Sequence, residues 1–402
     1  MNTTIGIIGG GQLGKMIAQE AKRMSLKVIV LDPTPDCPAV SVSDRQIVAD
    51  FKDRAAIREL AKSSDVVTYE IESGDTDALA ELEREGSKIY PSSETLRILQ
   101  DKLLQKEHLK KHGLPVPEFV DLAVNVSSPC ADDLAELYGK IVSKIGYPFV
   151  AKARRDSYDG RGNLTIHNES ELPLLVAAVT PNGKGPRKWM AEKFVPFKKE
   201  VSVMVARNLN GQIVCFPTVE NLHEQHILKK TIAPARVEPE VACRAVEIAQ
   251  SAIRALDGVG IFGVEMFVTG SGEVLINEIA PRPHNSGHYT IEACNHSQFE
   301  MHLRAILNQP LVQPTLNMPA VMVNILGEEN ADRPYNVEGV HELLAMPGVK
   351  LHLYGKKHSR LRRKLGHITA VEQTVDRAIG LAERAWRCVR IVPEDSAKEA
   401  VR

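Results

Sequence analysis

The sequence predicts a mixed α/β and α+β protein of two or three domains. Its 402 residues are enough for that many separate cores. Apolar runs at Thr4–Ile8 and Lys27–Leu31 flank a glycine turn and a helical stretch, Lys15–Met24, and this β-α-β order is typical of a parallel sheet. Further along, two apolar runs joined by the short turn Thr269-Gly270-Ser271-Gly272 predict an antiparallel hairpin.

The composition is that of an ordinary soluble enzyme. Charged residues make up 25% and aromatic residues 5%, and the net charge of −1 provides no overall attraction to nucleic acid or membrane. The six cysteines are scattered without a CxxC pair, which favours a reducing compartment and argues against a zinc site. The first strand begins close to Met1, and no apolar run approaches the roughly 20 residues of a membrane span. We therefore expect a cytoplasmic protein.

The first glycine turn has two interpretations. Gly9, Gly11 and Gly14 fit the spacing GxGxxG, and Asp32 ends the next strand, as in a dinucleotide site. The same turn also cradles other phosphates, or simply permits tight packing of a strand on a helix. No hydride-transfer site follows downstream, so the sequence disfavours NAD. The strand Asp65–Glu72 ends in acids, and Glu70 is either a substrate contact or a solvated loop residue.

The middle of the chain carries lysines placed to bind a polyphosphate. A helix predicted over Ser92–Lys111 holds Lys102 and Lys106, and the stretch Gly113–Pro117 breaks it. After a predicted helix at Asp132–Ile145 and a strand at Pro148–Ala153, which includes Lys152, comes the arginine-rich loop Arg154–Asn163. This loop is either a phosphate clamp or a mobile surface loop.

Two further strands, Lys188–Val195 and Glu200–Arg207, offer a nucleotide site of low specificity. The backbone of Glu192–Val195 is a candidate to pair with a purine edge, and Glu200 is a candidate to bind ribose hydroxyls. A strand predicted over Gln212–Val219 precedes His223 and His226. No HExxH helix surrounds them, so we expect one histidine to be a hydrogen-bond partner and the other to be exposed.

The predicted hairpin places one acid in each apolar strand, Glu265 in Phe262–Val268 and Glu278 in Val274–Ile279, after an amphipathic helix at Pro239–Leu256. Facing carboxylates on a sheet repel each other unless a cation neutralises them, and oxygen ligands, with Asn277 alongside, suit magnesium held jointly with phosphates. The alternative to a metal site is a structural salt bridge at a strand end. Arg282, His284, Asn285 and Ser286 follow as a dense set of donors for an anion.

The C-terminal part begins after a predicted helix at Ile291–Leu307 and three prolines. A strand at Ala320–Leu326 and a helix at Glu372–Val389 enclose the basic stretch Lys350–His367, which alternates like a strand pair. RNA binding, a solvated basic loop, or a phosphate-ester pocket closed by Lys356, Arg363 and Lys364 are the alternatives, and the pocket needs the fewest assumptions. The predicted domains are residues 1–112, residues 113–318 with a lid at about 113–190, and residues 319–402.

The order of motifs resembles a known family. GGGQLG, VAKARRDSYDGRGN, INEIAPRPHNSGH and YGK…RRKLGH are similar to the 5-(carboxyamino)imidazole ribonucleotide synthetases of purine biosynthesis, which are ATP-grasp ligases, and the resemblance covers essentially the whole chain. It implies an ATP-grasp fold with an N-terminal Rossmann-like (pre-ATP-grasp) domain and a small C-terminal β-rich domain. It also implies a homodimer that uses ATP, magnesium and bicarbonate to carboxylate 5-aminoimidazole ribonucleotide through carboxyphosphate, releasing ADP and phosphate.

The resemblance also assigns the site residues. It places magnesium on Glu265 and Glu278, and bicarbonate and carboxyphosphate on Arg282, His284, Asn285 and Ser286. It assigns ATP to Lys102, Lys106, Lys152, Gly160, Glu192, Lys193, Phe194, Val195, Glu200, His223, Asn277 and Glu278. It assigns the ribonucleotide to Gly11, Gln12, Leu13, Glu70, Tyr158, Asp159, Arg161, Lys356, Arg363 and Lys364.

Three rival functions remain at this point. The nearest is the formate-dependent glycinamide ribonucleotide transformylase, another ATP-grasp ligase, although the runs HNSGH and YDGRG favour the synthetase. From other classes, the rivals are an NAD-binding oxidoreductase and an RNA-binding module.

Overall fold

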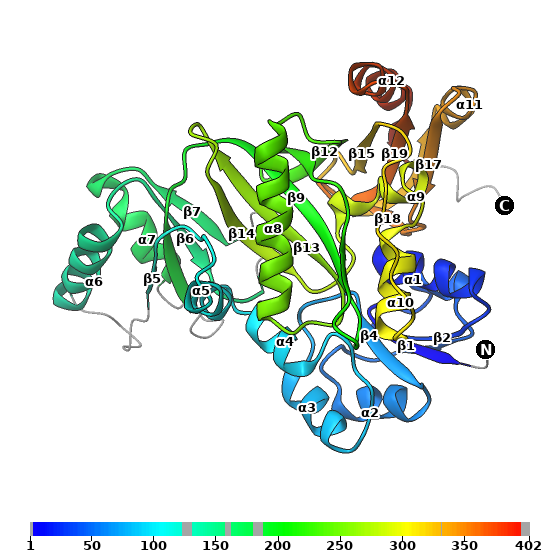
Figure 1. Ribbon diagram of the computed structural model, residues 1–402, viewed down its shortest axis with the longest axis horizontal. Helices are drawn as coiled ribbons and strands as arrows, with labels where there is room; N and C mark the ends of the chain where they lie inside the picture. Colours follow the sequence, from blue (N-terminus) through cyan, green and yellow to red (C-terminus); the bar gives the residue numbers. More distant parts are fainter. Residues whose placement is uncertain (1–2, 123–130, 157–161, 180–187, 331, 395–402) are drawn as a thin grey trace.

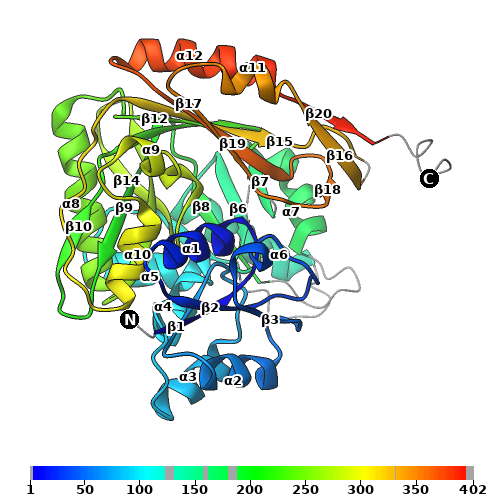
Figure 2. The same ribbon diagram turned by 90° about the vertical axis from the view of Figure 1, so that its right-hand side faces the viewer.

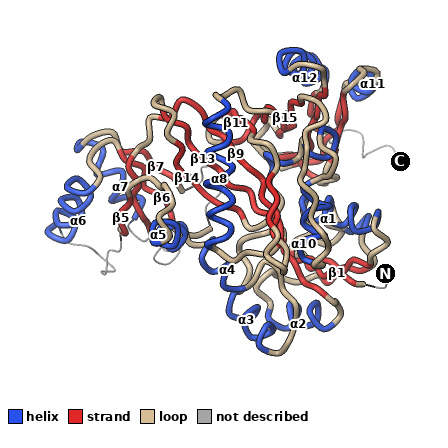
Figure 3. Tube along the Cα trace, viewed as in Figure 1, coloured by secondary structure: helices blue, strands red, loops and turns tan. Residues whose placement is uncertain are grey.

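The computed structural model describes residues 3–122, 131–156, 162–179, 188–330 and 332–394, whose strands form four sheets (Figure 1). Helices and strands alternate along much of the chain, as the tube coloured by secondary structure makes plain (Figure 3). No helix in this described part is both long and apolar enough to cross a lipid bilayer.

The N-terminal sheet is parallel and has the strand order β3-β2-β1-β4. Three of its strands are largely buried apolar runs, and the edge strand β3 is mostly polar. The strands are β1 (Thr4–Ile8), β2 (Lys27–Leu31), β3 (Arg45–Ile47) and β4 (Val66–Tyr69), and the helices are α1 (Gln12–Arg23), α2 (Arg54–Lys62) and α3 (Thr76–Arg84). Helix α1 begins three residues earlier than predicted, directly after Gly11.

The helix predicted over Ser92–Lys111 is two helices, α4 (Ser93–Leu99) and α5 (Lys102–Lys111). The side chain of Asp101 accepts hydrogen bonds from the backbone N–H groups of Leu103 and Leu104, so it caps a new helix and ends the previous one. The helix predicted over Ile291–Leu307 is likewise divided, into α9 (Thr290–Ala293) and α10 (Gln298–Ile306), with Ser297 as the second cap. In both cases the apolar periodicity continues across the break, and only the capping residue, Asp101 or Ser297, marks the start of a new helix.

A smaller antiparallel sheet, with the order β5-β8-β6-β7, forms the part predicted as the lid. It consists of β5 (Phe119–Asp121), β6 (Phe149–Ala153), β7 (Asn163–Ile166) and β8 (Trp189–Lys193), with helices α6 (Ala131–Lys144) and α7 (Leu172–Val179). Its core includes Phe149, Ala151 and Trp189.

The largest sheet has the order β14-β13-β9-β11-β12-β15-β19-β17, with β10 paired to β9. Its strands are β9 (Phe197–Arg207), β10 (Ile213–Cys215), β11 (Val219–Glu224), β12 (Ile227–Ala233), β13 (Gly260–Thr269), β14 (Val274–Ala280), β15 (Ala320–Leu326), β17 (Val349–Leu353) and β19 (Lys364–Val371). The strand predicted over Gln212–Val219 is confirmed only over Ile213–Cys215, because β10 ends at Cys215 and the next strand, β11, starts at Val219. The predicted pairing within Lys350–His367 is confirmed, since β17 runs antiparallel to β19.

The C-terminal strands continue the central sheet, because β15 pairs with β12. A short separate sheet of β16 (Arg333–Glu338), β18 (His358–Ser359) and β20 (Arg390–Pro393) lies beside it. Helices α11 (Val340–Leu344) and α12 (Val375–Cys388) lie next to each other on the outside of these strands (Figure 2). We propose that the chain divides into residues 1–112, 113–318 and 319–402, and that the second and third of these parts share the large sheet.

The two faces of the large sheet differ. Alternate residues of β9, such as Val201 and Val203, face helix α8 (Pro239–Ala255) in one apolar core, and α12 covers the same face further along. On the opposite face, seven neighbouring strands each contribute a polar residue to one row. Each of these residues lies directly opposite its neighbour in the next strand or two residues away from that position. We call this set the polar row: Glu278, Glu265, Ser202, Asn221, Thr231, Asn324 and His367.

The HNSGH segment, residues 284–288, lies on the polar row. Gly263 of β13 makes this possible, because a Cβ atom there would come within 2.6 Å of the His284 Cβ atom. Helix α10 follows and joins the N-terminal part: its His302 ring bonds the Thr68 hydroxyl of β4 at 2.8 Å and accepts the Ile261 backbone N–H at 3.2 Å. Helix α1 packs beside α10 (Figures 1 and 2).

Candidate active site

A continuous cleft of about 1880 Å³ lies where the N-terminal part, the lid sheet and the large sheet meet. A cleft of this size suits more than one small ligand. These predicted site residues line it: Gly11, Gln12, Leu13, Glu70, Lys102, Lys152, Glu192, Lys193, Phe194, Val195, Glu200, His223, Glu265, Asn277, Glu278, Arg282, His284, Asn285, Lys356, Arg363 and Lys364.

Six other predicted residues are placed differently. Tyr158, Asp159, Gly160 and Arg161 lie outside the described residues. Lys106 and Ser286 are absent from the wall, because their side chains are buried behind Glu192 and His284 respectively. The structure therefore makes these two supports for wall residues, where a direct ligand contact was predicted.

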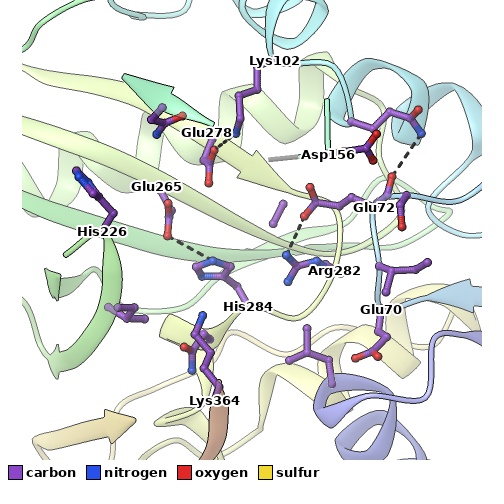
Figure 4. A pocket seen from close by; sticks show the side chains of 18 of the residues that line it. Glu70, Glu72, Lys102, Asp156, His226, Glu265, Glu278, Arg282, His284 and Lys364 are labelled. Atoms are coloured by element: carbon purple, nitrogen blue, oxygen red, sulfur yellow. Dashed lines mark hydrogen bonds and ion pairs between the residues drawn. The ribbon is translucent and has the colours of Figure 1, made fainter. Parts of the chain in front are cut away.

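Glu265 and Glu278 are direct partners across the β13–β14 hairpin, as the sequence predicted. Figure 4 shows the two carboxylates on neighbouring strands, with Lys102 reaching Glu278 from one side and His284 reaching Glu265 from the other. The Nε2 atom of His284 lies 3.3 Å from Oε1 of Glu265.

The two carboxylates titrate in opposite directions. Burial and the charge of Glu278 raise the pKa of Glu265. Burial alone would raise the pKa of Glu278 as well, but the ammonium groups of Lys102 and Lys152 outweigh it and lower that pKa. Two facing carboxylates in which one resists ionisation form a site that a divalent cation would stabilise, and oxygen donors of this kind fit magnesium.

The carboxylate pair is a magnesium site only if a ligand completes it. Among the described residues, no group of three or more His, Cys, Asp or Glu side chains is arranged to hold a metal ion. Two carboxylates with the remaining positions left to phosphate oxygens and water is how magnesium is commonly held beside nucleotides.

Three charged side chains from different elements meet beside this pair. Lys152 of β6 donates to Glu192 of β8 at 2.8 Å and to the side-chain oxygen of Asn277 at 3.1 Å. Lys106 of α5 lies 3.3 Å from the other oxygen of Glu192 and donates to the Ile276 carbonyl at 2.9 Å. Burial lowers the pKa of Lys106 to about 8. Burial would raise the pKa of Glu192, but the two lysines outweigh it and keep that pKa low.

The histidines after β10 divide as predicted. His223 Nδ1 lies 2.7 Å from Oε2 of Glu200, and His226 is exposed at the β11–β12 turn. Burial lowers the pKa of His223, but the hydrogen bond to Glu200 outweighs this effect and raises it. The pair faces the cleft near Glu265.

The predicted anion donors have specific partners. Arg282 lies 2.9 Å from Glu72, an acid that the sequence analysis had not assigned a role. Asn285 and Asn324 exchange two amide hydrogen bonds, of 3.1 and 2.7 Å, which fixes the orientation of the Asn285 side chain. Burial and the nearby charge of Arg282 lower the pKa of His284 to about 3, so this ring is neutral.

The GxGxxG turn is occupied by protein carboxylates. Glu70 accepts the backbone N–H groups of Gly11 and Gly14, and Asp32 accepts that of Gly10 at 2.8 Å. These are the donors that a dinucleotide pyrophosphate uses in a Rossmann site. The arrangement therefore argues against NAD at this turn.

The basic residues of the C-terminal part close the other end of the cleft. Lys356 is half-buried, and burial and then the charge of Arg363 lower its pKa to about 8. Lys364 also lines this end (Figure 4). Mutually repelling cations that face a cleft form a site for a dianion such as a phosphate ester.

Sequence reasoning missed the support of the site. Ser202, Asn221, Thr231 and Asn324 are each buried and bond, directly or through one another, to the HNSGH segment. For Ser202 and Asn324 the only sequence signal is a polar residue between apolar neighbours. Asn221 and Thr231 lie beside charged residues in β11 and β12 and carry no such signal.

Comparison with known proteins agrees with this geometry. Residues 1–100 match the ribonucleotide synthetase preATP-grasp domain, residues 107–299 the ATP-grasp domain, and residues 320–380 the phosphoribosylaminoimidazole carboxylase C-terminal domain. The N5-carboxyaminoimidazole ribonucleotide synthase of Bacillus subtilis is 41% identical over 382 residues, which cover 95% of this chain and 95% of that protein. The chain belongs to this synthase family. The expected ATP-grasp fold with its N-terminal preATP-grasp and small C-terminal domains is thereby confirmed.

Other relatives extend the comparison. The crystal structure of the Thermotoga maritima synthetase of this family has a TM-score of 0.85 at 49% identity and covers 98% of this chain and 100% of its own. An Aspergillus clavatus synthase solved with ADP and 5-aminoimidazole ribonucleotide has a TM-score of 0.84 at 37% identity, covering 96% and 98%. The phosphoribosylaminoimidazole carboxylase of Saccharomyces cerevisiae is 42% identical, and the matched region covers 92% of this chain but only 64% of that protein. The chain thus spans about two thirds of the length of such fungal relatives.

The buried histidines predict a loss of stability in acid. Burial lowers the pKa of His302 to about 3 and holds those of His288 and His367 well below the usual range. Below pH ~6.5, the usual pKa of an exposed histidine, the unfolded chain therefore binds protons that the folded chain refuses. The free energy of unfolding should fall by about 1.4 kcal/mol per pH unit for each such proton, or roughly 4 kcal/mol per unit for all three.

Urea unfolding at about pH 7.5 and about pH 5.5, with the proton uptake on unfolding measured at the lower value, checks this expectation. His302→Gln should reduce the uptake, whereas His341→Gln, at an exposed position, should leave it unchanged. Unfolding in acid without net proton uptake would contradict the prediction.

Proposed function

We propose that this protein carboxylates 5-aminoimidazole ribonucleotide with bicarbonate at the expense of ATP, giving 5-(carboxyamino)imidazole ribonucleotide, ADP and phosphate in purine biosynthesis. The observation that carries the proposal is the facing pair Glu265–Glu278 in a cleft whose far end is lined by Lys356, Arg363 and Lys364. A metal–triphosphate site and a phosphate-ester site at two ends of one cleft suit a nucleotide-driven reaction on a phosphorylated substrate. The names of the family's members and the ligands of the Aspergillus structure support it.

The nucleotide is proposed to bind between the lid sheet and the large sheet. Lys102 and Lys152 would contact the phosphates, with Asn277 and the two acids alongside. Bound magnesium would neutralise the charge that develops on the transferring phosphoryl group. The segment Glu192–Val195 would face the adenine and Glu200 the ribose, with His223 near by.

Bicarbonate is proposed to bind against Arg282, His284 and Asn285. Bicarbonate is a poor electrophile, so its oxygen takes the γ-phosphoryl group to give carboxyphosphate, whose breakdown delivers carbon dioxide to the substrate amine. Phosphoryl transfer of this kind needs positioning and charge neutralisation, with no protein nucleophile. Fixed donors beside a developing negative charge are commonly worth about 3–4 kcal/mol each in the transition state.

The ribonucleotide is proposed to lie between the first and third parts. Its phosphate would be held by Lys356, Arg363 and Lys364, and its other groups would face the α1 turn and Glu70. Because Glu70 already accepts two backbone N–H groups, its orientation is set before the substrate arrives.

We also propose that the protein is a cytoplasmic homodimer. The five described cysteines form no disulfide, which supports a reducing compartment. The dimer is supported by the family resemblance, and light scattering would then give twice the chain mass of 44.3 kDa.

The direct test is ADP release by the purified protein. With aminoimidazole ribonucleotide and ATP present, ADP release should depend on added bicarbonate, and the carboxylated product should appear in equal amount. Formate in place of bicarbonate, with glycinamide ribonucleotide as acceptor, is the comparison arm. Turnover that needs formate and ignores bicarbonate would favour the transformylase instead.

Glu278→Gln should reduce kcat/KM for ATP by at least about 100-fold, because a neutral amide cannot share a cation with Glu265 as a carboxylate does. Glu273→Gln, an exposed residue in the same hairpin turn, is the matched control and should retain parent activity. Near-normal turnover in Glu278→Gln would remove the metal assignment.

Lys356→Ala should raise KM for the ribonucleotide by about 10–100-fold with little change in KM for ATP, since a charge-assisted hydrogen bond to phosphate is lost. Lys350→Ala removes an exposed lysine of β17 and serves as the control. An unchanged KM for the ribonucleotide would place its phosphate elsewhere.

A further inference from the structure

The ring of His284 has a defined partner at each nitrogen. Its Nδ1 atom accepts the backbone N–H of Ser286 at 3.3 Å and lies 2.8 Å from the Ser286 hydroxyl. A backbone N–H can only donate, so Nδ1 must be the unprotonated nitrogen of the neutral ring. The ring proton then lies on Nε2, which points toward Oε1 of Glu265 at 3.3 Å.

A chain of buried side chains continues from Ser286 through the polar row. Ser202 of β9 donates to the Ser286 hydroxyl at 2.8 Å, and the Asn221 side-chain nitrogen of β11 donates to Ser202 at 3.0 Å. Thr231 of β12 donates to the side-chain oxygen of Asn221 at 3.1 Å. All four side chains are at most 3% exposed, so solvent does not compete for these bonds.

The direction of these hydrogen bonds is set at the His284 end and continues along the chain. At the His284 end, Nδ1 is an acceptor, so the Ser286 hydroxyl donates to it and must itself accept from Ser202. Ser202 has then used its proton and must accept from the amide nitrogen of Asn221. At the other end, the amide oxygen can only accept, which makes Thr231 a donor. Every proton therefore points toward His284.

The opposite tautomer conflicts with this arrangement. A proton on Nδ1 would face the Ser286 N–H, placing two donors against each other, and the Ser286 hydroxyl would lose its acceptor. A buried polar chain favours one protonation pattern when all its members are satisfied in one direction only.

We propose that Ser202, Asn221 and Thr231 are positioning residues that act through Ser286 to hold His284 as its Nε2–H tautomer. The ring then presents a fixed hydrogen-bond donor to the cleft beside Glu265, where a small oxyanion would accept it. That the oxyanion is bicarbonate or its phosphorylated form rests on the proposed function. The tautomer itself does not.

The test is the nitrogen spectrum of the free protein labelled with ¹⁵N-histidine. Long-range proton–nitrogen correlations distinguish the two neutral tautomers, and loss of one set of signals in His284→Asn assigns the residue. We expect an unprotonated Nδ1 and a protonated Nε2 in the parent protein. A protonated Nδ1 would overturn the proposal without any variant having to fold.

Two variants of the chain add a functional readout. Ser202→Ala removes one link, and Asn221→Asp replaces the donating amide by an acceptor, which draws the Ser202 proton away from Ser286. Both should produce a measurable fraction of the Nδ1–H tautomer and lower kcat/KM for bicarbonate by about 10-fold, with KM for ATP unchanged. Thr218→Val, a buried threonine of similar burial that bonds the Ala242 carbonyl outside the chain, is the control and should change neither.

The outcomes separate the two proposals. An unchanged tautomer in both variants, or a changed tautomer with unchanged kcat/KM for bicarbonate, would overturn the positioning role. If the parent shows the expected tautomer but its ADP release ignores bicarbonate, the proposed reaction fails and the assignment of the hydrogen-bond chain stands.

Discussion

The placement of two carboxylates side by side, Glu265 and Glu278, is the constraint on which the rest of the site depends. Because Glu265 and Glu278 are direct cross-strand partners, the strand register holds their carboxylates close together, and they repel each other. The surroundings offset this repulsion: Lys102 neutralises one carboxylate, and the neutral His284 ring lies against the other. A cation shared by the two carboxylates, as proposed above for magnesium, would relieve this repulsion.

The polar row continues on the same face of the large sheet beyond the hairpin. Ser202 and Asn324 of the polar row bond directly to the HNSGH segment, so the segment is held by side-chain hydrogen bonds to the sheet. Asn285 is fixed by Asn324, Ser286 by Ser202, and the His288 ring lies tilted against that of His367, with 4.8 Å between ring centroids. Buried polar networks that are satisfied in this way define one arrangement of the residues they hold.

The sequence allowed the hairpin pairing and the β-α-β opening to be predicted from local periodicity, and the residues that line the cleft to be predicted from the resemblance of its motifs to a known family. It did not reveal that Lys106 and Ser286 lie one layer behind the wall, since residue type alone does not distinguish a ligand contact from its support. Glu70 had two interpretations until its bonds to Gly11 and Gly14 were seen, because these contacts join residues 59 and 56 positions apart. The roles of Ser202, Asn221 and Thr231 could not be predicted for the same reason, because their hydrogen bonds join residues that are distant in sequence.

The continuity of the large sheet has a mechanical consequence. Uninterrupted strand pairing leads from β14, which carries Glu278, to β19, which begins at Lys364. The distance between the proposed nucleotide end and the proposed phosphate-ester end of the cleft is therefore set by the main-chain hydrogen bonds of one continuous sheet. Movement that encloses the reactants is then expected from the smaller β5-β8-β6-β7 sheet and the N-terminal part, which are separate from the large sheet. The large sheet itself keeps the two ends of the cleft at a fixed distance.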